Sequence, residues 1–423
     1  MSTAMAAEPR RLKILLSEGS SLSARHTLYS LGGRHTIDLM DPAALCQARF
    51  SRFVRRWHRC PSFSKDPQGY LRFLSVLLDR EKYDVLIPTH EQVFLLARVR
   101  DAVARRVGLA LPEFAALERL QSKADFSRLL DELALPQPRY TIVRSRAELD
   151  RDWDFPCFIK LAHSTAGGGV RKVDDRKELA AALDEFTQRG LSLEGSETMV
   201  QQPGIGVQST VQAVFQQGRM VAAHCFEARA IGVGGMSMAR VSASHPIVLE
   251  QMARLGRHVN WHGATFIDYF YDAATGQPQY IEANPRIGET VNAWLSGVNL
   301  CEALVQVSLG ESVTPPLSPR IGVRTHSGFM ILMAKALKGA SRGELWRERR
   351  MMRRGEDLYA DSEDELTRPR DDRLSVIPAL AVTAELLLNP SRARTIVKKT
   401  VDNYSLPAAA TQHIREMPPE AFS

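Results

Sequence analysis

Two runs rich in aromatic and β-branched residues, 265–271 and 280–286, constrain the fold of this chain more than any other segment. They enclose residues 272–278, whose Asp, Gly and Pro residues favour a turn. Runs of this composition on either side of a turn predict a β-hairpin. The register of a hairpin decides which side chains share a face, so this stretch also predicts a specific grouping of side chains.

The predicted hairpin brings three oxygen-bearing side chains onto one face. A turn centred on Thr275 places Asp268 directly opposite Glu282, and cross-strand neighbours on one face are roughly 4.5–5.5 Å apart. Asn284 is the next residue but one after Glu282, so it projects from the same face. Like charges at this spacing repel each other, and Mg²⁺ prefers one or two carboxylates combined with phosphate oxygens of a substrate. Asp268, Glu282 and Asn284 are therefore the predicted ligands of Mg²⁺, with Mn²⁺ as an alternative.

Arg286 lies just beyond these candidate ligands. Its planar guanidinium group matches a phosphate or a carboxylate, which makes it a candidate catalytic residue. The alternative is a solvated hairpin edge whose charges face water. The Asn-Pro-Arg string that follows so soon after Glu282 favours the metal site.

The string Ile-Glu-Ala-Asn-Pro-Arg at 281–286, with an acidic residue on the partner strand, resembles the metal-binding signature of the ATP-grasp superfamily. The carbamoyl-phosphate-synthase-like and carboxylate–amine ligase branches are the most similar, over roughly residues 13–310. The resemblance implies α/β and α+β folding, with a Rossmann-like N-terminal (pre-ATP-grasp) domain followed by a two-lobed ATP-grasp domain. The expected boundaries are 1–118 for the first domain, 119–310 for the second (lobe A about 119–195, lobe B about 196–310) and 311–423 for a mostly helical C-terminal appendage.

The composition is that of an ordinary globular protein of two or three domains, with 423 residues and a net charge of +7. Five cysteines without a CxxC pair favour a reducing compartment, and no apolar run approaches the ~18 residues of a membrane span. We therefore expect a cytoplasmic protein without a membrane partner. The two arginine-rich stretches, 49–59 and 347–354, carry no recognisable groove-reading motif and favour solvated helix faces or ion-pair networks over a nucleic-acid surface.

The first part of the chain contributes three candidate substrate residues. An apolar run at 13–16, a Gly/Ser turn and a helical stretch to residue 31 are typical of a doubly wound sheet. Ligands of such sheets bind at the carboxyl ends of the strands, where His90 and Glu91 follow the apolar run 84–88, and Arg25 lies in the first helix. A helix cap is the alternative role for the His-Glu pair. No complete GxGxxG string supports a dinucleotide site.

Two lysines are candidate nucleotide ligands. Lys123 lies in the first turn of a predicted helix, where the helix dipole disfavours a cation unless an anion binds there. Lys160 ends a predicted strand and precedes a glycine-rich loop whose backbone N–H groups suit an anion. The resemblance implies that both lysines contact ATP phosphates and that the loop is a flap over them. The predicted flap contacts are Ser164, Thr165, Gly167, Gly168 and Gly169.

Two further segments complete the predicted site. Residues 197–204 resemble the hinge between the lobes, where Gln201 and Gln202 are expected to contact adenine and ribose; Gln202 replaces the acid that commonly holds the ribose. The glycine-rich stretch 229–240 faces the acceptor substrate in relatives. Arg229 and Arg240 are expected to clamp a carboxylate or acyl phosphate there, with Ser237 as a further substrate contact.

The resemblance implies an ADP-forming ligase that uses ATP and Mg²⁺ to activate a small carboxylate as an acyl phosphate and then joins it to an amine. Three alternatives remain open: phosphorylation of bicarbonate or an enol oxygen by the same fold, a nucleotide-binding regulator without turnover, and a basic nucleic-acid binder. Neither substrate can be derived from the residues, and a homodimer is one possible assembly.

Overall fold

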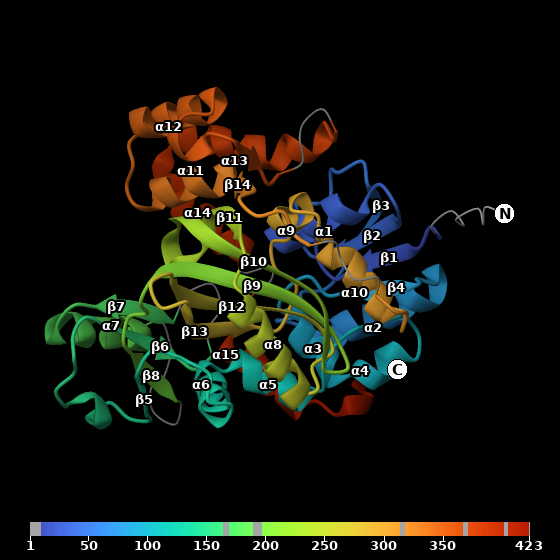
Figure 1. Cartoon of the computed structure of the whole chain (residues 1–423). Helices are drawn as coiled ribbons and strands as arrows, with labels where there is room; N and C mark the ends of the chain where they lie inside the picture. The colour runs from blue at the N-terminus through green and yellow to red at the C-terminus, as the bar shows by residue number, and fades with distance from the viewer. Residues whose placement is uncertain are drawn as a thin grey trace, which may run out of the picture.

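A parallel sheet opens the chain in the computed structural model, which describes residues 10–163, 169–188, 197–313, 318–366, 371–401 and 405–422. Its strand order is β3-β2-β1-β4, and every pair is parallel, as expected for a Rossmann-like unit (Figure 1). The apolar residues of the central strands are buried on both faces, which a parallel sheet covered by helices requires. The strands are β1 (Lys13–Leu16), β2 (Thr36–Asp41), β3 (Val54–Arg59) and β4 (Val85–Ile87), and the helices are α1 (Leu22–Leu31), α2 (Pro67–Glu81), α3 (Gln92–Arg98) and α4 (Arg100–Ala104).

A smaller antiparallel sheet has the order β5-β8-β6-β7. Three of its strands lie within the range 119–195 expected for lobe A, and β8 lies just beyond it. Helix α7 (Arg176–Gln188) covers one face of it, because Leu179, Leu183 and Phe186 recur at helical spacing and pack on the buried residues of the sheet. The strands are β5 (Tyr140–Val143), β6 (Cys157–Leu161), β7 (Val170–Val173) and β8 (Thr198–Gln201). Helices α5 (Phe114–Gln121) and α6 (Lys123–Glu132) connect this part to the first sheet.

The predicted lobe B is built on a seven-stranded sheet with the order β13-β12-β9-β10-β11-β14-β15. The hairpin of β9 (Val207–Gln216) and β10 (Arg219–Ile231) turns at Gln217 and Gly218, which both have positive φ, as a tight hairpin turn requires. The other strands are β11 (Ser237–Ala243), β12 (Gly263–Asp272), β13 (Gln277–Asn284), β14 (Arg324–His326) and β15 (Ser362–Asp364). The helices are α8 (Pro246–His258), α9 (Val291–Leu295) and α10 (Leu300–Ser308).

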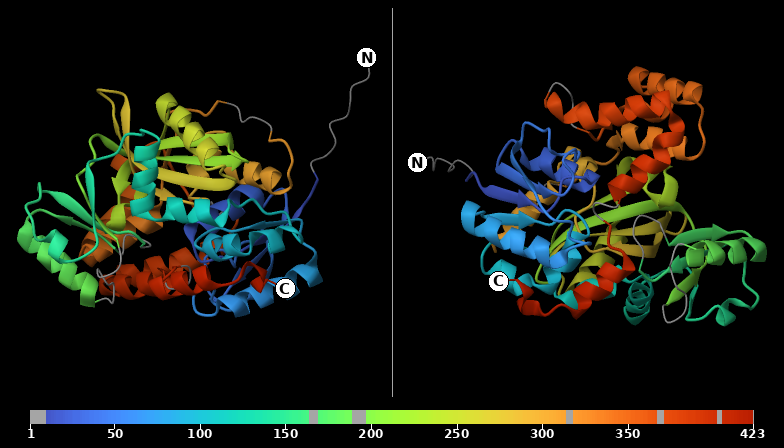
Figure 2. Two further views of the ribbon diagram at one scale, coloured as in Figure 1. Left: turned by 90° about the horizontal axis from the view of Figure 1, so that it is seen from below. Right: turned by 180° about the vertical axis from the view of Figure 1, so that it is seen from behind.

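The C-terminal part is helical but is not a separate appendage. Strands β14 and β15 extend the sheet of lobe B, and the last helix returns to the N-terminal part, where Ala410 and Ile414 share a core with Phe94 (Figure 2). The strands were not predicted because each has three residues and no alternating pattern. The helices are α11 (Gly328–Leu337), α12 (Arg342–Arg354), α13 (Ile377–Leu388), α14 (Ala393–Val401) and α15 (Ala408–Glu416).

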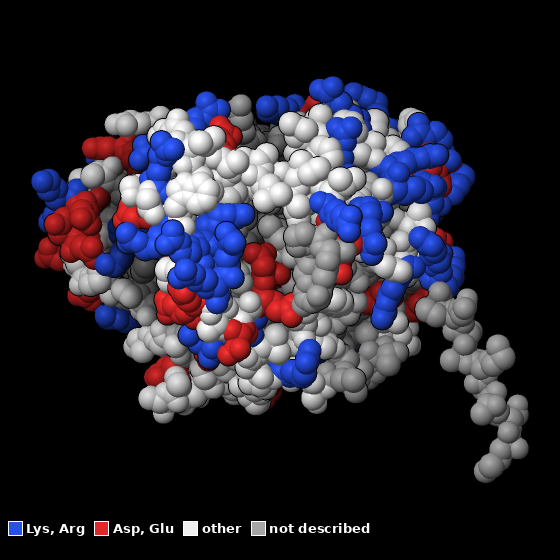
Figure 3. Space-filling model, turned by 90° about the horizontal axis from the view of Figure 1, so that it is seen from above, with Lys and Arg blue, Asp and Glu red and all other residues white. Residues whose placement is uncertain are grey.

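Basic residues form several separate groups on the upper face, with acidic residues between them (Figure 3). In the arginine-rich stretch around β3, Arg55 pairs with Asp38, and Arg56 pairs with Glu81 at 2.9 Å. These pairs fit the expected ion-pair network, although the stretch forms an edge strand and not a helix. Within the described ranges, no helix combines the length and the apolar character needed to cross a membrane.

Candidate functional site

The two acids of the predicted metal site are direct cross-strand partners. Strands β12 and β13 pair in a register that sets Asp268 opposite Glu282, as predicted. The turn itself is not centred on Thr275, because it pairs Asp272 with Gln277, and a one-residue bulge at Ile281 brings the two acids opposite each other. On its other side, β12 pairs with β9, and the hydroxyl of Thr210 donates to Asp268 Oδ1 at 2.6 Å. The sheet therefore holds two carboxylates side by side and fixes the orientation of one of them.

The two carboxyl groups differ in pKa because their surroundings differ. Burial raises the pKa of Asp268 to about 7; the Thr210 hydrogen bond opposes this rise, and the negative charge of Glu282 adds to it. Burial also acts to raise the pKa of Glu282, but the charges of Lys123 and Lys160 outweigh it and lower that pKa. Lys123 Nζ lies 3.0 Å from Glu282 Oε1. Lys123 thus forms an ion pair with Glu282, whereas the carboxyl group of Asp268 pairs with none of the described lysines.

Lys160 lies in a buried polar cradle between β6 and β8. Its Nζ donates to Gln201 Oε1 at 2.6 Å, and burial lowers its pKa to about 8 against the attraction of Glu282. The amide Nε2 of Gln201 is buried without a hydrogen-bond partner among the described residues. A buried donor without an acceptor is costly, so the cradle fits a ligand with acceptor atoms, as a nucleotide base or phosphate has.

Arg286 links the hairpin to the N-terminal sheet. Its Nη1 lies 3.1 Å from Glu91 Oε1, and Gln121 donates to the other oxygen of Glu91 at 2.8 Å. His90 Nδ1 is 4.0 Å from Glu91 Oε1, so the structure brings Arg286 together with two adjacent predicted residues from the N-terminal part. Arg286 Nε is buried and has no partner in the described part of the protein, which leaves a donor for an anionic group.

Arg240 lies in a buried ion cluster. One terminal nitrogen binds Glu365, and the other lies 2.6 Å from Glu289 Oε2 and 2.9 Å from the carbonyl oxygen of Ser237. Arg240 and Glu365 are both almost completely buried, with 3% and 1% of their side chains exposed. The acceptor-clamp role expected of Arg240 would therefore require it to exchange carboxylate partners. Arg25 also pairs with an acid of the C-terminal part: its Nη1 lies 3.9 Å from Asp372 Oδ2.

The other predicted residues are placed as follows. Arg229 is exposed near the end of β10, Gln202 donates to the Asp154 carbonyl at 2.9 Å, and the Gly169 carbonyl accepts from the Leu161 amide. The Asn284 carbonyl accepts from Thr265, and its side chain lies on the same strand face as Glu282. The predicted flap contacts Ser164, Thr165, Gly167 and Gly168 lie outside the described residues.

Sequence reasoning did not select several residues that touch the site. Thr210 and Gln121 have no motif and are found only through strand pairing and long-range packing. Glu289 lies three residues after Arg286, and this closeness to the metal-binding string is a signal in the sequence. Glu365 lies far along the chain, beyond the extent of the resemblance.

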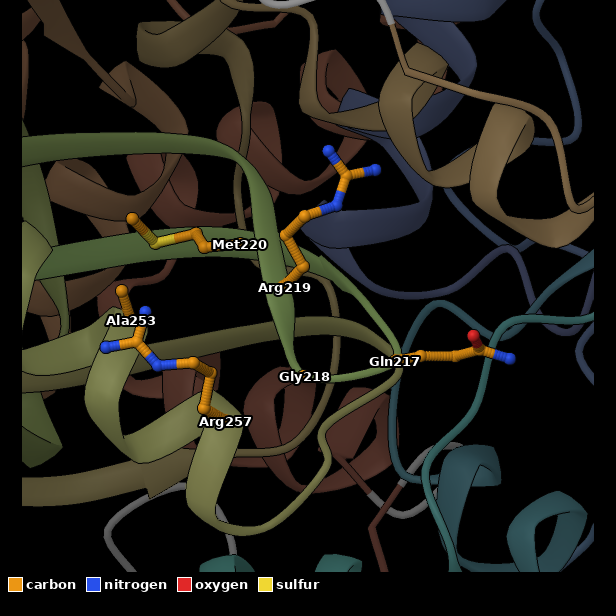
Figure 4. A pocket seen from close by; sticks show the side chains of 6 residues that line it. All are labelled: Gln217, Gly218, Arg219, Met220, Ala253 and Arg257. Carbon is orange, nitrogen blue, oxygen red and sulfur yellow. The ribbon is translucent and has the colours of Figure 1, made fainter.

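A surface hollow at the β9–β10 turn is distinct from this site (Figure 4). Its walls contain none of the predicted site residues, and Arg219 and Arg257 are its charged groups. The candidate site is therefore defined by the acids and lysines described above and not by that hollow.

The residues of the hairpin fit a magnesium ion only together with a substrate. In the part of the chain that the structure describes, no group of three or more His, Cys, Asp or Glu side chains could hold a metal. Two carboxylates and an amide oxygen form an incomplete set, which phosphate oxygens and water would complete.

Several curated proteins are similar to parts of the chain, whereas no family model matches it. Acetyl-CoA carboxylase 2 of Arabidopsis thaliana is 29% identical over 168 residues, 37% of this chain and 7% of that protein. D-alanine–D-alanine ligase of Heliobacterium modesticaldum is 27% identical over 40% of this chain and 51% of the ligase. The carbamoyl phosphate synthase large chain of Deinococcus radiodurans is 24% identical over 52% of this chain and 22% of that protein. The chain thus spans about half of one relative and a small part of the others.

Solved structures are similar over a larger part of the chain. An L-amino acid ligase from Bacillus licheniformis gives a TM-score of 0.54 at 17% identity, covering 73% of this chain and 76% of the ligase. The biotin carboxylase domain of a 2-oxoglutarate carboxylase from Hydrogenobacter thermophilus, solved with MgADP and bicarbonate, gives 0.57 at 14% identity, with 74% of both chains covered. At this level of identity the likeness establishes the fold.

Proposed function

We propose that this chain is an ATP-grasp protein and, more specifically, an ADP-forming ligase that joins a small carboxylate to an amine. The observation that carries the proposal is the cross-strand pair Asp268 and Glu282, with Lys123 on one acid and Lys160 close by in a buried cradle. The similarity to an L-amino acid ligase and a D-alanine–D-alanine ligase supports this type of reaction.

In the proposed reaction, an oxygen of the acceptor carboxylate attacks the γ-phosphorus of ATP, the bond to the β,γ-bridging oxygen breaks, and ADP leaves. The amine nitrogen then attacks the acyl carbon, the carbon–oxygen bond to phosphate breaks, and the nitrogen loses a proton to water. The products are the amide, ADP and phosphate. Mg²⁺ held by Asp268, Glu282 and Asn284 would neutralise charge on the phosphates when bound.

The protein's own side chains have separate tasks in this proposal. Lys123 and Lys160 hold the phosphates, and Gln201 offers its unpaired amide to the nucleotide. Arg286, oriented by Glu91, presents its Nε to the acceptor carboxylate and to the charge that develops on it. Arg229, exposed on the acceptor side, is a second candidate contact, whereas we assign Arg240 to positioning Glu289 and the C-terminal part. His90, Arg25, Ser237 and Gln202 remain proposed substrate or nucleotide contacts.

The proposal is tested by measuring ADP release with a panel of carboxylates and amines, with and without a magnesium chelator. The expected result is ADP formation that requires both substrates and Mg²⁺. Bicarbonate belongs in the panel, because the Hydrogenobacter domain was solved with it and relatives include acetyl-CoA carboxylases. ADP release with bicarbonate alone would favour that acceptor, and nucleotide binding without any release would favour the regulatory alternative.

Replacing Lys160 by Ala is expected to weaken the binding of Mg²⁺-ADP about tenfold or more, because a charge-assisted contact to phosphate contributes roughly 1.5–3 kcal/mol. Isothermal titration measures the affinity. Lys172→Ala is the matched control, since Lys172 is an exposed lysine on the neighbouring β7 that pairs with Asp174. Equal affinities for the two variants would remove Lys160 from the nucleotide site.

A further inference from the structure

The C-terminal helix α15 lies against the nucleotide side of the molecule. Ala410, Ile414 and Met417 are buried in the core that also contains Leu117 and Phe126, and Figure 1 shows α15 beside α5 and α6. The chain after α15 is held in place as well, because Arg98 Nε donates to the Met417 carbonyl at 2.7 Å. A segment outside the predicted ATP-grasp lobes is thereby anchored to α3 and the N-terminal core.

Arg415, in the last turn of α15, makes two polar contacts. Its Nε lies 2.5 Å from Glu118 Oε1, and its Nη2 lies 3.1 Å from His163 Nε2. A guanidinium group has only donors, so His163 Nε2 must accept, and the ring must carry its proton on Nδ1. Burial lowers the pKa of His163 to about 4, and the nearby charges of Arg415 and Lys123 act in the same direction. The contact therefore fixes the tautomer of this histidine and adds to the effect of burial, which favours the neutral state.

His163 lies next to the lysines that we assign to the phosphates. The preceding residue, Ala162, accepts a backbone hydrogen bond from the amide of Lys123 at 2.9 Å, and Lys160 lies on the strand that leads to it. None of the described residues accepts a hydrogen bond from His163 Nδ1. An N–H donor next to two cationic side chains is suited to a phosphate oxygen.

We propose that Arg415 is a positioning residue for the nucleotide, which holds His163 as a neutral donor whose Nδ1–H binds a phosphate group of ATP. This role rests on the proposed function only in requiring that nucleotide binds at Lys123 and Lys160. It gives the C-terminal part of the chain a task in nucleotide binding, although that part lies outside the lobes that carry the lysines and the acids.

The test is isothermal titration of the full-length protein with Mg²⁺-ADP. Arg415→Ala is expected to weaken binding about 3- to 10-fold, the value of one oriented hydrogen bond. Arg98→Ala is the matched control: it removes another arginine that anchors the same segment, through Met417, but makes no contact with His163. Its affinity is expected to stay within about twofold of wild type, since no phosphate donor is lost. Equal losses in both variants would show that docking of the segment, and not the His163 contact, supports binding, and would overturn the proposal.

Two substitutions of His163 separate its two nitrogens without disturbing α15. His163→Asn keeps an amide donor close to the position of Nδ1, whereas His163→Gln keeps a group at the position of Nε2 that can accept from Arg415 but provides no Nδ1 donor. The proposal expects Asn to retain more of the nucleotide affinity than Gln. The opposite order would assign the role to Nε2 and contradict the proposal.

The dependence of binding on pH provides a readout that a purely structural role would not change. The charged groups around His163 are Arg415, Lys123, Asp125 and Glu197. In Arg415→Ala, the imidazole loses one cation that lowers its pKa, while burial, the largest cause, and Lys123 remain, so its pKa rises only in part. The loss of affinity relative to wild type should therefore shrink as the pH falls from 8 towards 5, because the imidazolium forms at a higher pH in the variant and attracts phosphate. A constant ratio would contradict the proposal.

The outcomes also distinguish this role from the proposed function. Failure of the wild-type protein to take up nucleotide would overturn both. Normal uptake by wild type and an unchanged affinity in Arg415→Ala would overturn only the role of Arg415. If turnover is found, Arg415→Ala should raise the KM for ATP and leave the KM for the acceptor unchanged, because His163 lies on the side of the phosphates.

Discussion

Replacing Glu282 by Gln is expected to lower the rate of ADP formation by about 10²- to 10³-fold, the cost of removing one well-placed group that stabilises the transition-state charge. The amide has almost the same shape but lacks the charge that a magnesium ion and Lys123 require. Folding should change little, since the amide oxygen of Gln can still accept a hydrogen bond from Lys123 and one third of the Glu282 side chain is exposed. A coupled assay for ADP and the thermal unfolding midpoint measure the two effects.

Glu250→Gln is the matched control for this substitution. Glu250 is an exposed acid on α8. Its substitution by Gln removes one negative charge, as Glu282→Gln does, but at a position away from the hairpin. Its activity should equal that of wild type. Binding of ADP without magnesium should survive in Glu282→Gln, because Lys123 and Lys160 both remain. Normal turnover in Glu282→Gln would contradict the assignment of Glu282 as a metal ligand.

The hairpin could be predicted from the sequence because its information is local. Side chains alternate along a strand, so a turn symmetric about Thr275 predicts the opposition of Asp268 and Glu282. The structure has this pair for a different reason: the turn pairs Asp272 with Gln277, and a bulge at Ile281 shifts the register by the one residue that sets Asp268 opposite Glu282. Helix α6, with Lys123 in its first turn, is predictable for a similar reason, because its apolar residues recur at helical spacing and Pro136 follows its end. The contact between Lys123 and Glu282 joins two such local elements, and only the fold could bring them together.

The parts that the sequence did not predict depend on long-range contacts. Glu365 reaches Arg240 because β15 joins the sheet of lobe B, and three residues without alternation carry no signal for that pairing. Arg415 reaches His163 because α15 docks on the N-terminal core. Arg415 and His163 are both partly buried and share no sequence pattern, so only the folded chain shows that they are neighbours.

The cluster around Arg240 provides the largest expected effect on stability. Arg240→Leu leaves Glu365 buried without its main cation, and removing one partner of a buried pair costs about 3–5 kcal/mol. Burial acts to raise the pKa of Glu365, but the charge of Arg240 and other contacts outweigh it, so the pKa is lowered. The loss of stability in Arg240→Leu should therefore be present at neutral pH and should diminish as falling pH protonates Glu365. Urea unfolding at pH 7 and thermal unfolding across a pH series measure both effects.

Two further variants decide whether charge or shape causes the loss in Arg240→Leu. Arg229→Leu removes an exposed arginine from the neighbouring strand β10 and should change the free energy of unfolding by no more than about 0.5 kcal/mol. The double variant Arg240→Leu with Glu365→Gln should recover part of the lost stability, because a neutral amide costs less to bury than an unpaired carboxylate. If the double variant is as unstable as the sum of the two single variants, the cavity left by the guanidinium stem, and not the stranded charge of Glu365, is the cause. In that case the docking of β15 onto lobe B depends on packing, and the C-terminal part is held by its apolar contacts.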